Sequence, residues 1–140
     1  MTGTAVRHLF VYGTLRPGEV RWHHLEPFVV GDGIDTTVRG DLYDTGLDYP
    51  AAVFADPAAS HDGDASEAVG SIRGRVYELL ADRLDAALAH LDDVEGAVRG
   101  LYHRVTVPTS AGVLAWAYQC GDDALLRHRI ASGDWQDRKR

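Results

Sequence analysis

Short apolar runs bounded by glycine and proline open the chain. Residues 8–12 (HLFVY) are mostly β-branched or aromatic and stop at Gly13, which predicts a buried strand followed by a loop. Residues 21–28 predict a short helix, which we expect Pro27 to end because proline lacks the backbone donor that a helix needs. The chain therefore begins as strand, loop and short helix.

Residues 29–53 alternate short apolar runs with turn signals. These signals stand at residues 31–33, 40–41 and 44–46. We therefore expect several short strands joined by tight loops. Residues 56–67 are polar and lack periodicity, which predicts a mobile surface loop. Residues 69–80 follow as a long strand, in which Gly70 and Gly74 indicate a bulge or a barrel bend.

The strongest helical pattern covers residues 82–95. Its leucines recur at i, i+4 and i+7, which is the spacing of one face of an amphipathic helix. They are Leu84, Leu88 and Leu91. We expect Asp82 to cap the start of this helix and Gly96 to end it in a left-handed conformation.

Two apolar runs in the last third of the chain flank a turn. Residues 101–107 and 113–120 lie on either side of residues 108–112 (PTSAG), which predicts a β-hairpin. Residues 122–130 predict a short helix. Strands outnumber helices in a mixed order, so the chain fits the α+β class. Its 140 residues fit a single domain covering residues 1–140.

Composition narrows the classes of function. The net charge is −7, from 21 acidic and 14 basic residues, which argues against nucleic-acid binding because that depends on clustered Lys and Arg. No apolar stretch approaches the roughly 20 residues of a membrane span, and the N-terminus lacks a signal-peptide pattern. We therefore expect a cytoplasmic protein without nucleic acid or membrane as a partner. The pattern does not indicate an oligomeric state.

The end of the first predicted strand is a candidate binding site. Residues 11–16 (VYGTLR) lead from that strand into a glycine turn. Backbone N–H groups after such a turn can form a concave nest that binds a carboxylate or phosphate. Gly13 also permits close approach of a ligand to the backbone. Taken alone, this pattern is more often a plain turn.

The acidic end of the predicted helix is a candidate catalytic site. Residues 91–96 (LDDVEG) carry three carboxylates where the helix dipole disfavours ionisation by roughly 0.3–1 kcal/mol. Mutual repulsion and burial act in the same direction. A glutamate with a raised pKa suits general-base chemistry near neutral pH, which makes Glu95 a candidate. By composition alone, an acidic helix face in solvent is more common.

Aromatic residues at strand positions form a third set. They are Tyr43, Tyr49, Tyr77, Tyr102, Trp116 and Tyr118. Trp116 and Tyr118 lie two residues apart and so face the same side of a strand. We expect most of the set in the core, although a small-molecule cavity has a similar lining. No metal, nucleotide or nucleophile-elbow spacing is present in the chain.

Taken together, these segments resemble the short bacterial branch of the γ-glutamylcyclotransferase-like family, also called AIG2-like. The family's Tyr-Gly-Ser/Thr-Leu motif stands at residues 12–15. Its Leu-Asp-x-x-Glu-Gly motif stands at residues 91–96, with Tyr102 seven residues after the glutamate. Residues 49–53 (YPAAV) and 132–135 (SGDW) also match. The resemblance covers nearly the whole chain in the expected order.

The resemblance implies a small mixed β-barrel with flanking helices and a pocket at one barrel end. In such a pocket, backbone amides after the first strand hold the α-carboxylate of a γ-glutamyl group, and Glu95 transfers protons. The residues implied in substrate binding are Tyr12, Gly13, Thr14, Leu15, Tyr102, Tyr49, Trp116 and Tyr118.

The implied reaction converts a γ-glutamyl group into 5-oxoproline without a cofactor or metal. The substrate's α-amine attacks its own γ-amide carbonyl, and one carboxylate acts first as base and then as acid. The leaving group stays open among amino acids, peptides, amines and biosynthetic intermediates. The alternative is a non-catalytic module that binds a γ-glutamyl or other small carboxylate ligand.

Overall fold

The computed structural model describes most of the chain in separate segments. They are residues 6–12, 22–45, 50–54, 70–94, 102–121, 124, 126–130 and 133–134. The loop predicted at residues 56–67 lies outside these segments, as does the predicted helix stop at Gly96.

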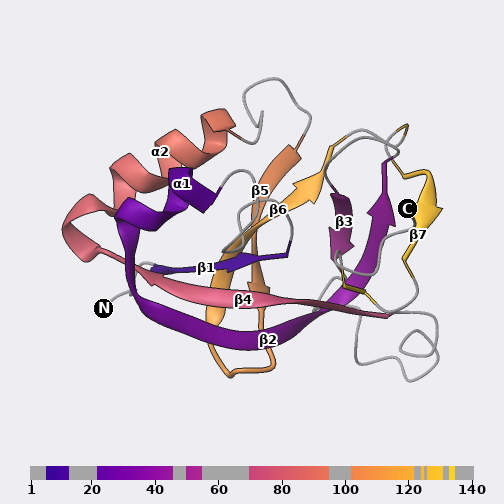
Figure 1. Cartoon of the computed structure of the whole chain (residues 1–140), viewed down its shortest axis with the longest axis horizontal. Helices are drawn as coiled ribbons and strands as arrows, with labels where there is room; N and C mark the ends of the chain where they lie inside the picture. The colour runs from indigo at the N-terminus through magenta and orange to yellow at the C-terminus, as the bar shows by residue number, and fades with distance from the viewer. Residues whose placement is uncertain are drawn as a thin grey trace.

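The described strands form one mixed β-sheet that curls into a nearly closed barrel (Figure 1). The strands are β1 (His8–Val11), β2 (Val29–Asp44), β3 (Pro50–Phe54), β4 (Ser71–Leu79), β5 (Tyr102–Pro108), β6 (Leu114–Cys120) and β7 (His128–Arg129). Their order is β3-β2-β4-β1-β6-β5, with β7 paired to β2. β1 runs parallel to β6, and the other pairs are antiparallel. The expected α+β barrel with flanking helices is confirmed.

Side chains close the seam between the two ends of this sheet. The backbone N–H of Phe54 in β3 donates to Gln119 Oε1 of β6 at 2.9 Å. The hydroxyl of Tyr102 in β5 donates to the carbonyl oxygen of Pro50 in β3. These two bonds hold β3 against β5 and β6, which are not its neighbours in the strand order.

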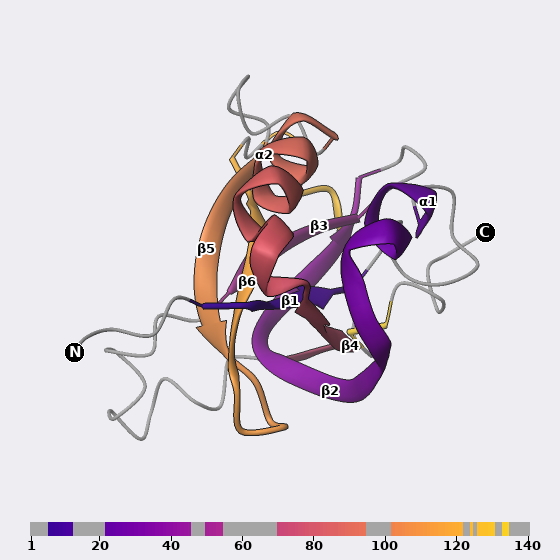
Figure 2. The ribbon, with the colours of Figure 1, turned by 90° about the vertical axis from the view of Figure 1, so that its left-hand side faces the viewer.

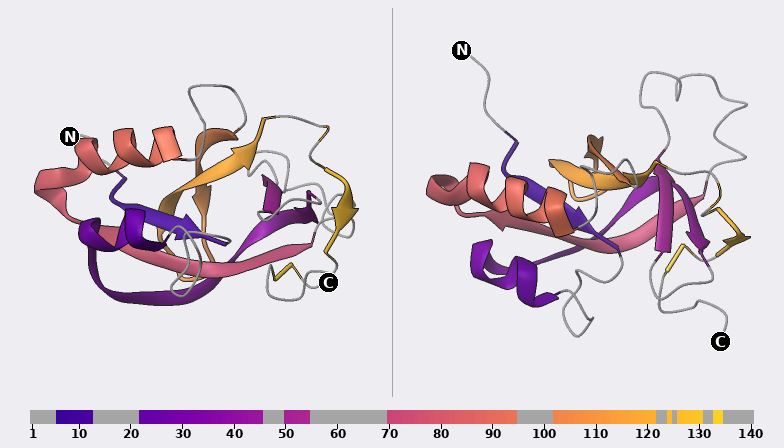
Figure 3. Two further views of the ribbon diagram at one scale, coloured as in Figure 1. Left: turned by 45° about the horizontal axis from the view of Figure 1, so that its top comes forward. Right: turned by 90° about the horizontal axis from the view of Figure 1, so that it is seen from above.

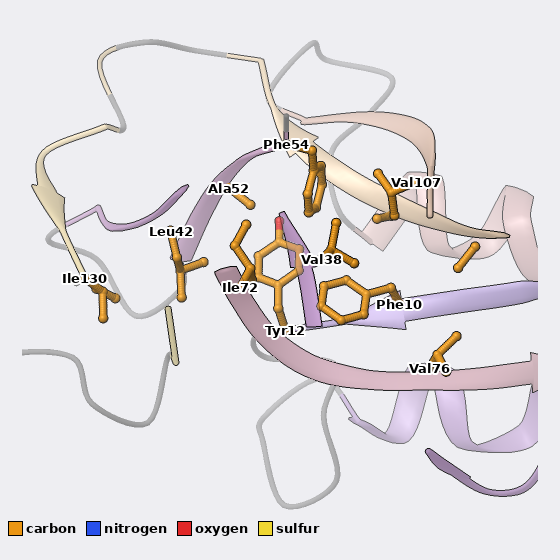
Figure 4. Close-up of a cluster of buried hydrophobic side chains, with 12 residues drawn as sticks. Phe10, Tyr12, Val38, Leu42, Ala52, Phe54, Ile72, Val76, Val107 and Ile130 are labelled. Carbon is orange, nitrogen blue, oxygen red and sulfur yellow. The ribbon is translucent and has the colours of Figure 1, made fainter. Parts of the chain in front are cut away.

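Alternation along the strands divides the apolar residues into two clusters. In β1, Phe10 belongs to one cluster while Leu9 and Val11 belong to the other, because successive side chains of a strand point to opposite faces. The first cluster fills the barrel interior (Figure 4). Its buried members are Phe10, Tyr12, Val38, Leu42, Ala52, Phe54, Ile72, Val76, Val107, Ala115, Ala117 and Ile130.

The second cluster lies between the sheet and two helices, α1 (Trp22–Leu25) and α2 (Leu84–Val94), which cover one outer face of the barrel (Figures 2 and 3). Its buried members are Leu9, Val11, Leu25, Tyr77, Leu79, Leu88, Leu91, Tyr102 and Tyr118. No helix in the described segments is long and apolar enough to cross a membrane.

The long helix predicted at residues 82–95 is confirmed as α2 over its described part. It buries Leu88 and Leu91, as the leucine spacing predicts. The expected N-cap at Asp82 is wrong, because Asp82 lies inside a 3-10 turn, η4 (Ala81–Arg83), that connects β4 to α2. The α-helical residues begin only after this turn, at Leu84.

The short helix predicted at residues 21–28 is α1 followed by a 3-10 turn, η1 (Glu26–Phe28). The α-helix ends before Pro27, as expected. Proline is accepted in the first turn of η1 because the N–H groups there have no intrahelical partner to lose.

Of the several short strands predicted across residues 29–53, only the last is found, as β3, and the prediction is wrong for residues 29–44. β2 runs unbroken through sixteen residues and pairs with β4, with a register shift between Val30 and Ile34. Gly31 and Gly33, at φ of 75°, produce this bulge instead of a chain reversal, since glycine adopts positive φ without a steric penalty. The turn signals at residues 31–33 and 40–41 therefore lie within one strand, whereas the third signal begins at Asp44, where β2 ends before its antiparallel partner β3.

The C-terminal hairpin is confirmed as β5 and β6, whereas the helix predicted at residues 122–130 is wrong over residues 126–130. His128 and Arg129 form β7 against β2. The backbone N–H of Ile130 donates to Leu42 O at 2.7 Å, and the Ile130 side chain lies in the barrel cluster. Pairing with an available sheet edge overrides the local helical preference.

Candidate functional site

The structure describes four of the residues predicted for the site. They are Tyr12, Tyr102, Trp116 and Tyr118. The predicted residues outside the described segments are Gly13, Thr14, Leu15, Tyr49 and Glu95. The site is therefore built from the chain segments that lead into these residues, which are the ends of β1 and α2 and the start of β3.

Tyr118 connects the ends of β1 and α2. Its backbone carbonyl oxygen accepts a hydrogen bond from the hydroxyl of Tyr12, which directly follows β1. Its own hydroxyl donates to Asp92 Oδ1 in the last turn of α2 at 2.8 Å. Both tyrosines are buried, at 6% and 2% exposure. Two motifs about eighty positions apart in the sequence are thus joined through one residue of β6.

A charge pair anchors the end of α2 to β5. Arg104 Nε donates to Asp92 Oδ1 at 2.7 Å, and Arg104 Nη2 donates to Asp92 Oδ2 at 3.1 Å. Each side chain is 24% exposed. The hydrogen bond to Asp92 raises the pKa of Arg104, despite the opposing effect of its burial, so the guanidinium stays charged. This two-pronged geometry holds the helix end more firmly than a single contact does.

Trp116 supports this charge pair from β6. The Arg104 guanidinium carbon lies 4.4 Å from the centroid of the Trp116 ring, which is the geometry of a cation–π contact. The indole N–H donates to the carbonyl oxygen of Val6 at 2.9 Å. Trp116 and Tyr118 both pack with the second cluster, as their spacing of two residues predicts.

Tyr102 brings the start of β3 to the same region. It is the first residue of β5 and is buried at 6% exposure. Its hydroxyl donates to the carbonyl oxygen of Pro50, which directly follows Tyr49 in the chain. Tyr102 therefore holds the chain next to Tyr49 against β5.

The pairing of Asp92 with Arg104 changes the electrostatic argument for the acidic helix end. The sequence suggests three carboxylates repelling one another. In the structure, Arg104 compensates the charge of Asp92, and Asp93 is exposed to solvent. Repulsion within the cluster is therefore weaker than the sequence suggests. Among the residues that the structure describes, no group of three or more His, Cys, Asp or Glu side chains is arranged to hold a metal ion.

Sequence reasoning missed both members of this pair as site residues. The available signal was Arg104, two residues after Tyr102 and thus on the same face of β5. An arginine on the buried face of a strand requires a charged or polar partner. That requirement does not name the partner, because Asp92, Asp93 and Glu95 are all within reach along the sequence.

Comparison with known proteins assigns the chain to a family. Residues 9–137 match the family described as gamma-glutamyl cyclotransferase, AIG2-like. The chain belongs to this family. The match includes β1 from Leu9 onward, α2 and the β5–β6 hairpin, whose contacts form the site described above.

Two relatives have names that specify the activity of this family. A protein of Halalkalibacterium halodurans, named provisionally as a γ-glutamylcyclotransferase, is 34% identical over 102 residues, which cover 71% of this chain and 81% of the relative. The γ-L-glutamyl-butirosin B γ-glutamyl cyclotransferase of Niallia circulans is 28% identical over 137 residues, covering 92% and 75%. Family and names together indicate γ-glutamyl cyclotransferase activity.

Solved structures share the fold. A Pyrococcus horikoshii protein superposes with a TM-score of 0.65 at 24% identity, covering 95% of this chain and 92% of the other. A mouse AIG2-like protein superposes with a TM-score of 0.54 at 20% identity, covering 89% and 86%. At these identities the likeness establishes the barrel architecture alone.

Proposed function

We propose that the protein is a γ-glutamyl cyclotransferase in which Glu95 is the proton-transfer residue. The substrate's α-amine attacks the γ-carbonyl carbon, which forms the lactam C–N bond of 5-oxoproline. The original amide C–N bond then breaks and releases an amine, amino acid or peptide. The bonds formed and broken in this reaction require no cofactor.

The link through Tyr118 is the observation that carries this proposal. The reaction needs a carboxylate-binding group and a proton-transfer group on either side of one small substrate. Tyr12 begins the motif proposed for the first role, and Asp92 lies three residues before the group proposed for the second. Both contact Tyr118 directly, so the two motifs start from neighbouring points of the fold.

Glu95 serves in two successive steps of the proposed mechanism. It accepts a proton from the attacking α-ammonium group, so that the amine becomes nucleophilic. It delivers this proton to the departing nitrogen and relays there the second proton that the attacking nitrogen loses on becoming the lactam N–H, so the leaving group departs as a protonated amine. The same carboxylate is regenerated, and the general acid–base contribution is typically about 10²–10⁴-fold in rate.

We assign the substrate contacts by their place in the chain. The backbone N–H groups from Tyr12 to Leu15 hold the substrate's α-carboxylate, because amides of a strand-to-loop turn bind anions without a charged side chain. Tyr102 and Tyr49 line the pocket, since the hydroxyl of Tyr102 holds the start of β3. Trp116 and Tyr118, which we expected as wall residues, support the site by holding Arg104 and Asp92.

The leaving group is proposed as a γ-glutamyl-linked amine or amino acid. The name of the Niallia circulans relative specifies a γ-glutamyl group attached to the aminoglycoside butirosin. A panel of γ-glutamyl amino acids, γ-glutamyl amines, glutathione and γ-glutamyl-ε-lysine covers the chemical classes, and mass spectrometry detects 5-oxoproline from each. Turnover of one class identifies the acceptor.

Glu95→Gln is the decisive variant. It keeps the size of the side chain and removes its ability to carry a proton, so 5-oxoproline release should fall by at least about 10²-fold. Glu78→Gln is the matched control, because Glu78 is exposed on β4 and should be dispensable. Thermal melting checks that both variants fold.

Two outcomes would contradict the proposal. Wild-type turnover in Glu95→Gln would exclude Glu95 as the proton-transfer residue. Binding of γ-glutamyl ligands without product over the whole panel would identify a non-catalytic binding module. Calorimetric titration with a γ-glutamyl analogue that cannot cyclise separates binding from turnover.

A further inference from the structure

The last turn of α2 is held by a small network of defined geometry. The Asp92 carboxylate accepts bonds from Arg104 through both of its oxygens and a further bond from the Tyr118 hydroxyl. Leu91, beside it in the chain, is fully buried in the second cluster. The network therefore fixes both the position and the rotation of α2 at its end.

We propose that Asp92 and Arg104 form a positioning and charge-balancing pair for Glu95, an inference that rests on the proposed function of Glu95. Glu95 follows Val94, the last residue of α2, by one peptide bond. Consecutive Cα atoms are about 3.8 Å apart, so the fixed helix end determines where Glu95 begins. The network thereby restricts the positions that the proton-transfer carboxylate can reach.

Several contacts distinguish this pair from an ordinary surface ion pair. Both side chains are largely shielded, at 24% exposure, and the bond between them is two-pronged. Trp116 covers the guanidinium from β6. Such shielding makes the geometry specific, whereas an exposed ion pair contributes little and holds no fixed geometry.

The charges of Asp92 and Arg104 should also influence the titration of Glu95. Three residues of extended chain span at most about 11 Å, which is comparable to the Debye length of about 8–10 Å. Arg104 from β5 and Tyr118 from β6 face the Asp92 carboxylate, and Asp93 next to it is exposed. The paired Asp92 and Arg104 carry no net charge, so we expect their combined effect on Glu95 to be smaller than the effect of either charge alone.

Removing either charge should therefore shift the titration of Glu95 in opposite directions. Asp92→Asn leaves the Arg104 cation uncompensated, which favours the Glu95 carboxylate and moves its titration to lower pH. Arg104→Gln leaves the Asp92 anion uncompensated and moves the titration to higher pH. Each shift should be a few tenths to about one pH unit, and the double variant should return close to wild type.

Two measurements report these shifts. The side-chain ¹³Cδ signal of Glu95, identified by its loss in Glu95→Gln, titrates directly in nuclear magnetic resonance spectra. The acidic limb of the pH profile of kcat/KM reports the same group in the active enzyme. The spectroscopic titration tests the pair even if Glu95→Gln retains turnover, so failure of the inference and failure of the proposed function are distinguishable.

Measurements of kcat and KM distinguish a positioning effect of the pair from a charge effect. Asp92→Asn and Arg104→Gln should each lower kcat by about 10–100-fold, because small displacements of a reacting group are costly. KM should change little, since the α-carboxylate is bound by another segment. Arg104→Lys keeps the charge and loses the two-pronged bond, so kcat should fall while the Glu95 titration stays near that of wild type.

Asp35→Asn is the control for net charge. Asp35 pairs with Arg75 at 2.7 Å between β2 and β4, and neither belongs to α2 or β5. This variant should leave both the Glu95 titration and kcat unchanged. Shifts of the same sign in Asp92→Asn and Arg104→Gln, or no shift with wild-type kcat, would overturn the inference.

Discussion

Gly74→Ala tests the close packing of β4 against β1 at the edge of the proposed site. Gly74 lies in the middle of β4, and a Cβ atom added there would come within 2.2 Å of Val11 O and 2.8 Å of two ring carbons of Phe10. Real Cβ atoms essentially never approach another heavy atom below 3.0 Å. Gly74 therefore permits an approach of the two strands that alanine forbids.

The cost of this substitution follows from what must move. Val11 O is backbone and cannot rotate away, so β1 must shift by about 1 Å relative to β4. Phe10 is 1% exposed and packs against Tyr12 and Phe54, so its ring has no free space to enter. Overpacking typically costs about 1–3 kcal/mol, occasionally more, and we expect about 3 kcal/mol here because both backbone and ring are displaced.

Urea unfolding followed by tryptophan fluorescence measures this loss. Trp22 and Trp116 both pack with the second cluster and should report its exposure. Gly31→Ala is the contrasting variant: its Cβ would meet nothing within 4 Å, but its φ is +75°. Gly31→Ala should be destabilised only by the backbone strain of alanine at positive φ, which costs about 1–2 kcal/mol.

The result that would refute the packing argument is specific. A Gly74→Ala protein within about 0.5 kcal/mol of wild type, the range of ordinary surface substitutions, would show that β1 and β4 separate easily. The variant should also lose cyclotransferase activity, because Val11 directly precedes the motif proposed to bind substrate. Full activity at unchanged stability would contradict both parts.

Two further substitutions test individual hydroxyl groups. Tyr12→Phe removes the donor to Tyr118 O and should cost about 1–2 kcal/mol in urea unfolding, with a lower kcat/KM; unchanged values in both assays would contradict the link between β1 and β6. Burial raises the pKa of Tyr77, an effect that Arg75 partly offsets. The unfolded chain therefore releases this proton at lower pH than the folded protein does. The stability contributed by Tyr77 is complete below about pH 10 and is lost as pH rises through its folded pKa. Tyr77→Phe should show a shallower alkaline loss of stability in urea unfolding as the pH rises above about 10, and an identical slope would contradict this.

Local sequence patterns were sufficient to predict several elements and to indicate the family. The leucine spacing predicted α2, and the PTSAG turn predicted the β5–β6 hairpin, because both depend on residues close in sequence. The motifs at residues 12–15 and 91–96 were sufficient to indicate the family that residues 9–137 match. A motif identifies the chemistry that a segment can perform without specifying what lies beside it.

The tertiary structure alone decided how these motifs meet. Glycine permits either a turn or a bulge, so pairing with β4 determined that β2 continues through Gly31. Pairing with β2 likewise made β7 a strand. The choice of Asp92 as the partner of Arg104, and the contacts of Tyr118 with Tyr12 and Asp92, arise from elements far apart in the chain. Such contacts depend on the barrel and the helix packing against it, which no short stretch of sequence determines.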